Sequence, residues 1–344
     1  MPDTAHEKQA IRWGIIGAGA IAATVARDIE VTFGNVVHGV AARDRARARA
    51  FADALGVRRH YSDYEELVAD DDIDVVYIAT THPHHRRHAL LAIEAGKHVL
   101  VEKPAGLNAL EAQEMFEAAT QRGVFAMEAM WMRLNPLVRM AHEFALQGAI
   151  GEVLSVRHEF GLGMPFDPEH RLYDRSNGGG ALLDLCIYPI NFAHLMLGPP
   201  DEVTTVGALA PTGVDETVAQ QWLFAGVPRA QLWASISVHA PNQAAVLGTD
   251  GWMLLEAPSY RPSGLVINDR LRTYRIDDPL LGHGVGYGPQ IEEVARCIRA
   301  GLLESPFVRH DDTVAVLRIL DRAREALGVS YPNEETEEPG DAGS

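Results

Sequence analysis

Ile11-Arg12-Trp13-Gly14-Ile15-Ile16-Gly17-Ala18-Gly19-Ala20-Ile21-Ala22 joins a short apolar run to a glycine-rich turn. The apolar run predicts a buried strand, and apolar residues recur at helical spacing after the turn. In such an arrangement Gly17 permits the tight turn, Gly19 lets the backbone approach a pyrophosphate, and Ala22 is small enough for close packing of helix on strand. The pattern therefore indicates a dinucleotide site.

Strands and helices alternate up to about residue 130, which is typical of a parallel sheet covered by helices. The strands that we expect are 36–41, 75–79, 98–101 and 124–127, and the helices 20–29, 45–55, 88–95 and 109–122. Strands then follow one another, at 153–160, 203–209, 217–224, 230–238, 252–255 and 264–267, with helices only at 181–197, 290–300 and 312–327. This second pattern predicts a mostly antiparallel sheet.

The sequence thus predicts an α/β Rossmann domain over residues 11–130 and an α+β domain over residues 131–330 with a large, mostly antiparallel open sheet. Residues 1–10 are expected to be flexible. The acidic segment 331–344 has no apolar period and is expected to be a disordered tail.

The composition is that of a globular protein, with 47% hydrophobic and 22% charged residues. A net charge of −17 argues against a nucleic-acid partner. We expect no apolar run long enough to cross a membrane, and the N-terminus lacks the apolar core of a signal peptide. Two cysteines cannot form a disulfide framework. These features predict a cytoplasmic protein.

Glu102-Lys103-Pro104 follows the expected strand 98–101. The carboxyl ends of parallel strands meet at the edge of the sheet where ligands bind, so the lysine would lie at the same edge as the glycine turn. A lysine alone carries little information. Together with the glycine turn it indicates an oxidoreductase.

The end of the second strand indicates which dinucleotide is bound. An NAD site usually has an acidic residue here for the ribose, whereas this chain has Ala42 followed by Arg43, which suits a 2′-phosphate. NADP is therefore favoured over NAD. Asp44 keeps the NAD alternative open, because a shift of one residue would place it at the ribose. We read Arg47 and Arg49 as a solvated helix face. The phosphates would lie at the helix N-terminus, at Ala20 and Ile21.

Four histidines fall within seven residues, at positions 82, 84, 85 and 88. His84 and His88 have the i, i+4 spacing of a metal site, but no third ligand follows at a recognised spacing, so we predict no metal. We expect His82 or His85, with Thr80, to line the dinucleotide site, and the other histidines to lie at the surface.

Gly178-Gly179-Gly180-Ala181-Leu182-Leu183-Asp184-Leu185-Cys186-Ile187-Tyr188 leads three glycines into a helix. Asp184 and Tyr188 have i, i+4 spacing and would share one face. A carboxylate and a phenol there, with a lysine, can bind an alcohol and move its proton, because a nearby ammonium lowers the pKa of a phenol. The alternative is an aspartate at a helix N-terminus and a packed tyrosine.

These motifs resemble those of the glucose-fructose oxidoreductase/inositol dehydrogenase family (Gfo/Idh/MocA) over residues 11–330. The matching features are Gly17-x-Gly19-x-x-Ala22, Ala79-Thr80-x-His82-x-x-His85, Glu102-Lys103-Pro104 and Asp184-x-x-x-Tyr188. Tyr188, where many relatives have His, is most similar to the branch of dimeric dihydrodiol dehydrogenases and NADP-dependent D-xylose or D-glucose dehydrogenases.

The resemblance implies a role for each matching residue. Tyr188 would be the general acid/base, Lys103 would position the alcohol, and Asp184 would bind a substrate hydroxyl. The remaining implied contacts with cofactor or substrate are Glu102, Trp131, Arg133 and Phe160. The resemblance also implies a homodimer, or a dimer of dimers, through the open face of the second sheet.

Cys186 departs from the branch, which usually has Gly there, and Thr81 stands where relatives often have Pro. The extra bulk of Cys186 could reshape the pocket. The sequence as a whole predicts an NADP-dependent oxidoreductase acting on a sugar or a cyclic trans-diol. A reductase of keto-sugars and a non-catalytic dinucleotide sensor are the alternatives.

Overall fold

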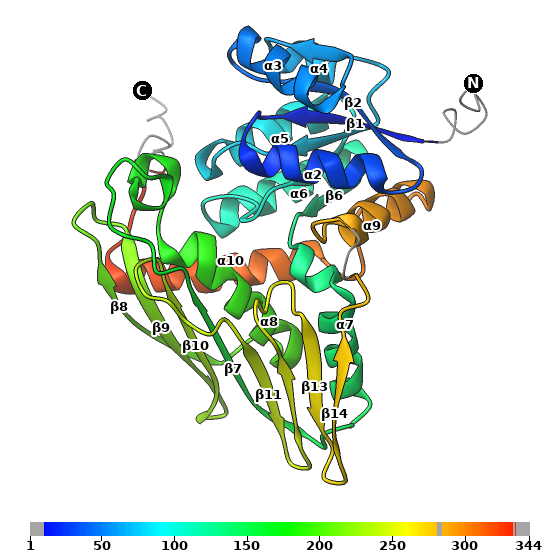
Figure 1. Ribbon diagram of the computed structural model, residues 1–344. Helices are drawn as coiled ribbons and strands as arrows, with labels where there is room; N and C mark the ends of the chain where they lie inside the picture. The colour runs from blue at the N-terminus through cyan, green and yellow to red at the C-terminus, as the bar shows by residue number, and fades with distance from the viewer. Residues whose placement is uncertain (1–9, 281–283, 333, 335–344) are drawn as a thin grey trace. The chain divides into compact units, whose positions relative to one another are not determined.

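The computed structural model describes residues 10–280, 284–332 and 334 (Figure 1). The chain forms two compact units. The first consists of residues up to 106, 110–135 and 280–314, and the second of residues 107–109, 136–279 and those from 315 on. Each is described by itself. The stretch 284–314, far along the chain, thus belongs to the same unit as the glycine turn.

The first unit contains a six-stranded parallel sheet in the order β3-β2-β1-β4-β5-β6. Its strands are β1 (Ile11–Ile16), β2 (Asn35–Ala41), β3 (Arg59–Tyr61), β4 (Val75–Ile78), β5 (His98–Val101) and β6 (Ala126–Glu128). Its helices are α2 (Ala20–Val31), α3 (Arg45–Leu55), α4 (Tyr64–Val68), α5 (His85–Glu94), α6 (Ala109–Arg122) and α9 (Gly288–Arg299), of which α6 begins at the boundary with the second unit. The predicted α/β architecture is confirmed.

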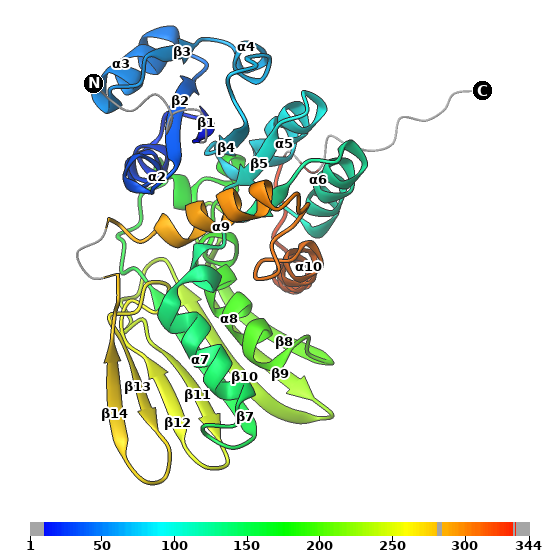
Figure 2. The same ribbon diagram turned by 90° about the vertical axis from the view of Figure 1, so that its right-hand side faces the viewer.

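The second unit contains an eight-stranded sheet in the order β14-β13-β12-β11-β7-β10-β9-β8 (Figure 2). All neighbouring pairs are antiparallel except β7 with β10. The strands are β7 (Val153–Gly161), β8 (Glu202–Leu209), β9 (Asp215–Phe224), β10 (Val227–Ser235), β11 (Ala244–Gly248), β12 (Trp252–Leu255), β13 (Gly264–Asn268) and β14 (Thr273–Asp277). The predicted mostly antiparallel sheet is confirmed.

Helices α7 (Pro136–Leu146) and α8 (Ile187–Leu197) cover one face of this sheet (Figure 2). Helix α10 (His310–Leu327) contributes its residues from 315 on to the second unit. Burial alternates along β7, where Val156, His158 and Phe160 are buried and Arg157 is exposed. One face of the sheet therefore forms the core with the helices, as is usual for an antiparallel sheet.

One apolar stretch is longer than we expected from the sequence. Arg175–Leu197 has the length and composition of a membrane-crossing helix, so the expectation that no run approaches that length is wrong here. Its most apolar window is 83% buried inside the protein. Such burial is that of a core helix, and the stretch carries no argument for a membrane.

Candidate active site

The glycine turn lies at the carboxyl ends of β1 and β4, where β1 separates β2 from β4. Gly17 has a φ of +110°, and a Cβ on it would come within 2.6 Å of the Ala79 carbonyl oxygen, so only glycine fits. A Cβ on Gly19, which caps α2, would meet no described atom within 4 Å. The backbone N–H groups of Ala20 and Ile21, in the first turn of α2, thus lie beside open space. This position suits the phosphates of a dinucleotide.

Arg43 and Asp44, which follow β2, bear on the choice of cofactor. Arg43 is exposed. The Asp44 carboxylate accepts a hydrogen bond from the backbone N–H of Arg47 at 2.8 Å and so caps α3. This is the carboxylate that kept the NAD alternative open.

Arg47 and Arg49 differ, although the sequence analysis treated them alike. The Arg47 guanidinium donates to the Ala18 carbonyl at 3.0 and 3.3 Å. Arg47 is exposed, as predicted, and its side chain in addition contacts the glycine turn. Arg49 is 72% exposed and lies 3.7 Å from Asp53, and its predicted solvation is confirmed.

The turn after β5 is held at several points. Glu102 is buried and accepts the Tyr77 hydroxyl at 2.5 Å, and Lys103 next to it is half-buried. The backbone N–H of Ala105 donates to the Glu128 carboxylate at 3.0 Å, and the Thr313 hydroxyl donates to its other oxygen at 3.3 Å. Burial raises the pKa of Glu128 to about 7. Glu128 was not among the sequence-predicted site residues.

His85 connects this turn with the end of β4. Its Nδ1 lies 2.7 Å from the Pro104 carbonyl and its Nε2 3.0 Å from the Thr80 carbonyl, and the side chain is fully buried. Burial lowers the pKa of His85 to about 4, which favours the neutral ring. This arrangement gives His85 a structural role at the sheet edge, and its contact with a dinucleotide stays a prediction.

The other histidines divide between interior and surface. His82 is buried, with its ring 5.7 Å from that of His85. His84 is exposed, as expected. His88 is buried and its Nδ1 lies 3.1 Å from the Thr80 hydroxyl, so the prediction that it lies at the surface is wrong. Its ring fills the space beside Tyr64 on α4, an element that the sequence analysis missed.

Trp131 and Arg133 are both buried in the first unit. The Trp131 ring stacks on Tyr287 with centroids 4.3 Å apart. The backbone N–H groups of residues 285–287 all donate to the Asp28 carboxylate, the shortest at 2.8 Å, and so fix the segment that carries Tyr287. Arg133 forms an ion pair with Asp312 at 2.9 Å. Contacts of Trp131 and Arg133 with cofactor or substrate stay predictions.

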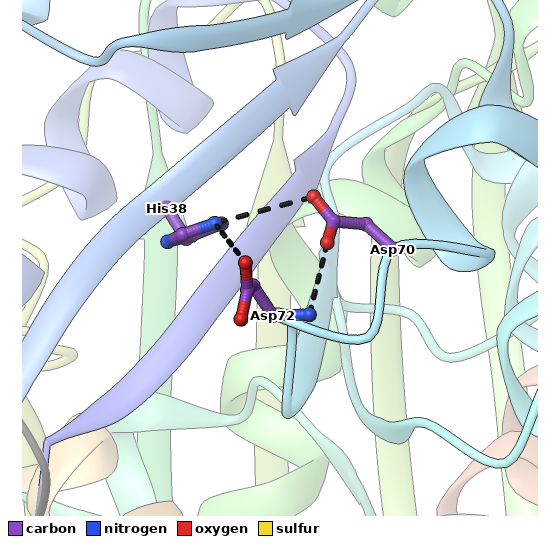
Figure 3. Close-up of side chains that lie close together, drawn as sticks. All are labelled: His38, Asp70 and Asp72. Atoms are coloured by element: carbon purple, nitrogen blue, oxygen red, sulfur yellow. Dashed lines mark hydrogen bonds and ion pairs between the residues drawn. The ribbon is translucent and has the colours of Figure 1, made fainter.

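A histidine and two carboxylates elsewhere in the first unit have the composition of a metal site. Figure 3 shows His38 with Asp70 and Asp72, whose possible ligand atoms lie within 4.8 Å of one another. Arg59 already pairs with both carboxylates, at 2.5 and 2.8 Å, and Arg12 pairs with Asp72. The two arginines neutralise this cluster, so it gives no support for a metal.

In the second unit, Asp184 and Tyr188 lie where a π-helical turn, Leu182–Cys186, runs into α8. The Ile187 N–H bonds to the Leu182 carbonyl five residues earlier. The spacing of Asp184 and Tyr188 therefore spans a wider turn than the α-helix assumed from the sequence. Asp184 is buried and pairs with two nitrogens of Arg171 at 3.1 and 3.3 Å.

Tyr188 belongs to an aromatic cluster with Phe160 at the end of β7 and Tyr260 in the loop before β13. The three ring centroids lie 5.1 to 5.6 Å apart, with Phe160 and Tyr260 stacked. His158 and Asn242 hold the loop, through the Ser259 hydroxyl at 2.6 Å and the Ser259 N–H at 2.8 Å. Such a wall of rings can contact the apolar face of a cyclic substrate.

Arg171 and Tyr260 were not predicted as site residues from the sequence. Neither residue stands in a motif, and only the folded loops bring them to Asp184 and Tyr188. Cys186 is fully buried, and burial raises the pKa of its thiol. This placement favours packing behind the helix over a contact with substrate.

The sequence and fold can be compared with known proteins. A model described as "Oxidoreductase family, NAD-binding Rossmann fold" matches residues 11–130, and one for the GFO/IDH/MocA C-terminal domain matches residues 138–254. A trans-1,2-dihydrobenzene-1,2-diol dehydrogenase from Mus musculus is 38% identical over 94% of this chain and 99% of its own length. The chain belongs to the Gfo/Idh/MocA family. The resemblance inferred from the motifs is confirmed.

Solved structures in the comparison share the fold. Levoglucosan dehydrogenase in complex with NADH and levoglucosan has a TM-score of 0.82 at 23% identity, covering 94% of this chain and 100% of its own. A 3-ketoreductase from Actinomadura kijaniata in complex with NADP and TDP-benzene has a TM-score of 0.79 at 26% identity, covering 92% and 98%. Both are oxidoreductase structures with a nicotinamide cofactor. The family model and the dehydrogenase relative show that the chain is an oxidoreductase, with a Rossmann fold that binds a nicotinamide cofactor.

Proposed function

We propose that this protein is an NADP-dependent dehydrogenase that oxidises a secondary alcohol of a cyclic trans-diol, with sugars as the second class of substrate. The identity of 38% to a trans-dihydrodiol dehydrogenase over nearly the whole chain carries the proposal. The retained Lys103, Asp184 and Tyr188 support it, because a non-catalytic sensor has no need of groups that transfer protons.

The site residues support a division of roles. The cofactor supplies hydride chemistry at the nicotinamide when it is bound. Tyr188 would accept the proton of the substrate hydroxyl as the C–H bond breaks, while Lys103, in the role that the family resemblance gives it, would position the alcohol. Asp184, held by Arg171, would accept a hydrogen bond from the neighbouring hydroxyl. A trans-dihydrodiol would give a ketol that becomes a catechol.

The aromatic cluster favours a ring diol over a sugar. Phe160 and Tyr260 lie beside the proposed base, and their rings stack on one another. The diene part of a dihydrodiol ring is apolar and suits contact with such rings. A sugar would bring additional hydroxyls that need partners.

NADP is proposed over NAD on the basis of Arg43. The residues after β2 offer the exposed guanidinium of Arg43, and one oxygen of the Asp44 carboxylate is engaged in capping α3. A guanidinium binds a 2′-phosphate through charge-assisted hydrogen bonds that NAD cannot make.

A substrate panel tests the proposal. Trans-dihydrodiols, aldoses and inositols are each offered with NADP⁺ or NAD⁺, and reduced cofactor is followed at 340 nm. We expect the highest kcat/KM with a trans-dihydrodiol and NADP⁺. Preference for an aldose would move the assignment to sugars, and a protein that binds NADP⁺ but oxidises none of the panel would contradict the proposed function.

We also propose a homodimer through the face of the second sheet that α7 and α8 leave uncovered. A groove there is lined by Val206, Trp233 and Leu254, among others, and Val206 is 62% exposed. The groove also has polar lining residues, among them Gln221 and Gln231, and such a mixed surface on a broad sheet suits a second copy of itself. Light scattering should give twice the chain mass, and Val206→Arg should give the monomer. A wild-type monomer at micromolar concentration would contradict the dimer.

A further inference from the structure

The turn that precedes Asp184 and Tyr188 is closely confined. A Cβ on Gly179 would lie 2.7 Å from the carbonyl oxygens of both Arg171 and Leu172. Gly180 has a φ of +125°, and a Cβ on it would lie 2.3 Å from the Asp215 carboxylate. Residues other than glycine are therefore excluded at both positions, and a shift of this turn moves the helical turn after it.

Asp215 fixes the start of the helical turn Leu182–Cys186. Its buried carboxylate accepts the backbone N–H of Leu182 at 2.5 Å, which caps the turn. Burial raises the pKa of Asp215 to about 7. The path of the backbone from Gly180 to Asp184 is thus set by side chains that lie outside the helix.

Tyr331 reaches the same turn from the end of the chain. Its side chain is fully buried, and its hydroxyl donates to the Gly179 carbonyl at 2.8 Å. Burial raises the pKa of Tyr331 well above the ordinary value, which keeps the phenol protonated and able to donate. Tyr331 begins the acidic segment that was predicted to be a disordered tail, and at this residue the prediction is wrong.

Further contacts hold the residues beside Tyr331. The Arg175 guanidinium donates to the Ser330 carbonyl at 2.6 and 3.1 Å. Glu334 accepts two hydrogen bonds from the buried guanidinium of Arg324, at 2.8 and 2.9 Å. We call residues 329–332 together with Glu334 the C-terminal segment. Charge-assisted bonds of this kind, partly shielded from water, are stronger than those between exposed groups.

We propose that the C-terminal segment positions the proposed catalytic helix, with Tyr331 as the positioning residue that fixes Gly179. The inference rests on the proposed function for its kinetic consequence. Gly179 lies five residues before Asp184 and nine before Tyr188, and the confined turn between them transmits a displacement of the Gly179 carbonyl to both side chains. Tyr331 touches neither Asp184 nor Tyr188 in any contact described above, so its effect on catalysis is indirect.

Tyr331→Phe tests the proposal, because it removes one hydroxyl and keeps the ring. We expect kcat for the best diol to fall roughly 10-fold to 100-fold, since small misplacements of reacting groups have effects of this size. The Kd for NADP⁺ should stay within about twofold, because the glycine turn belongs to the other unit. Thr217→Val is the matched control, because it also removes one hydroxyl group. Thr217 bonds to Ser235 within the eight-stranded sheet and lies outside the turn that contains Gly179.

Hydrogen exchange gives a readout that does not depend on the proposed function. In Tyr331→Phe, backbone amides in the peptide covering residues 178–190 should exchange faster than in the wild type and in Thr217→Val. If the wild type oxidises no substrate, the proposed function fails. The hydrogen-exchange measurement then still tests whether the C-terminal segment positions the helix. Unchanged exchange there, or an unchanged kcat with only a lower Tm, would overturn the inference.

Arg175→Ala provides a second variant if Tyr331→Phe does not fold. Arg175 is partly exposed, and its loss releases the carbonyl of Ser330, the residue next to Tyr331. We expect the same changes in kcat and exchange, in a smaller degree. Wild-type behaviour in both measurements would count against the C-terminal segment as a positioning element.

Discussion

Glu128 accepts the backbone N–H of Ala105 at 3.0 Å, two residues beyond Lys103. The contact comes from β6, whose Glu128 pairs with Val101 at the end of β5. Two neighbouring strands thus determine where the lysine stands. With His85 on the Pro104 carbonyl, both polar groups of the peptide bond between Pro104 and Ala105 are engaged.

Glu128→Ala should therefore lower kcat by about 10²-fold, an effect typical of a misplaced reacting group. Glu128→Gln keeps an oxygen that can accept the Ala105 N–H and should retain most of the activity. Steady-state kinetics of both variants, at temperatures well below their Tm, make the comparison. Equal losses in the two variants would show that the acceptor oxygen is not what matters.

The same carboxyl predicts a pH dependence of stability. Burial raises the pKa of Glu128 and of Asp215 to about 7. The folded state then binds more protons than the unfolded state between about pH 4.5 and 7, so the free energy of unfolding falls as the pH rises through that window. Glu128 can account for up to about 3 kcal/mol of this change.

Urea unfolding at pH 5 and pH 8 measures that dependence, and Glu128→Gln should flatten it. His85 acts in the opposite sense. Its lowered pKa, about 4, means that stability is lost as the pH falls from about 6.5 through that value. Because His85, His88 and His158 all oppose the carboxyl groups, the comparison of Glu128→Gln with the wild type carries the test. A variant whose stability changes between pH 5 and pH 8 by the same amount as that of the wild type would contradict the assignment of Glu128.

Arg43→Ala should weaken binding of NADP⁺ much more than binding of NAD⁺, by about 1.5–3 kcal/mol, since the lost contact is to a group that NAD lacks. Arg49→Ala is the matched control, because Arg49 is an exposed arginine on α3, 3.7 Å from Asp53. Fluorescence titration with both cofactors gives the two dissociation constants. Losses of similar size for NADP⁺ and NAD⁺ would exclude Arg43 as the discriminator.

Tyr188→Phe should lower kcat by about 10²–10⁴-fold, the usual contribution of a general acid/base. Affinity for NADP⁺ should be nearly unchanged. Tyr260→Phe is the comparison variant, since it removes a phenol from the same aromatic cluster. A Tyr188→Phe enzyme with near-normal turnover would remove Tyr188 from the mechanism.

Cys186→Gly should change kcat/KM for all substrates by one common factor and lower stability by about 1–3 kcal/mol. The thiol is fully buried, so its loss leaves a small cavity, and glycine weakens a helix. The substrate panel and thermal unfolding together measure both effects. A changed order of substrate preference would show instead that Cys186 narrows the pocket.

The elements that could be predicted from the sequence have local signals. Helix α3 begins and ends where expected, because Asp44 caps its start and Gly56 takes the left-handed conformation after its end. The short pieces β3 and α4 were missed, since three to five mostly polar residues show no period. Helix α7 had a signal that was overlooked, a proline at its first position before Leu137, Val138 and Ala141.

The site could be predicted only as far as its motifs extend. Lys103 and Tyr188 stand in sequence patterns, whereas the support from Glu128, Arg171 and Tyr331 comes from residues distant in the chain. Such contacts depend on tertiary structure and leave no local periodicity. The π-helical turn at Asp184 is a further case, because its sequence reads as an ordinary α-helix.

The contact between Asp28 and residues 285–287 has a consequence for the order of events during synthesis. The two sides are separated by some 257 residues, and the whole second sheet is encoded between them. Most of the chain must therefore be synthesised before the first unit can form its last contacts. Until then the six-stranded sheet lacks α9, and contacts of such long range slow the final step of folding.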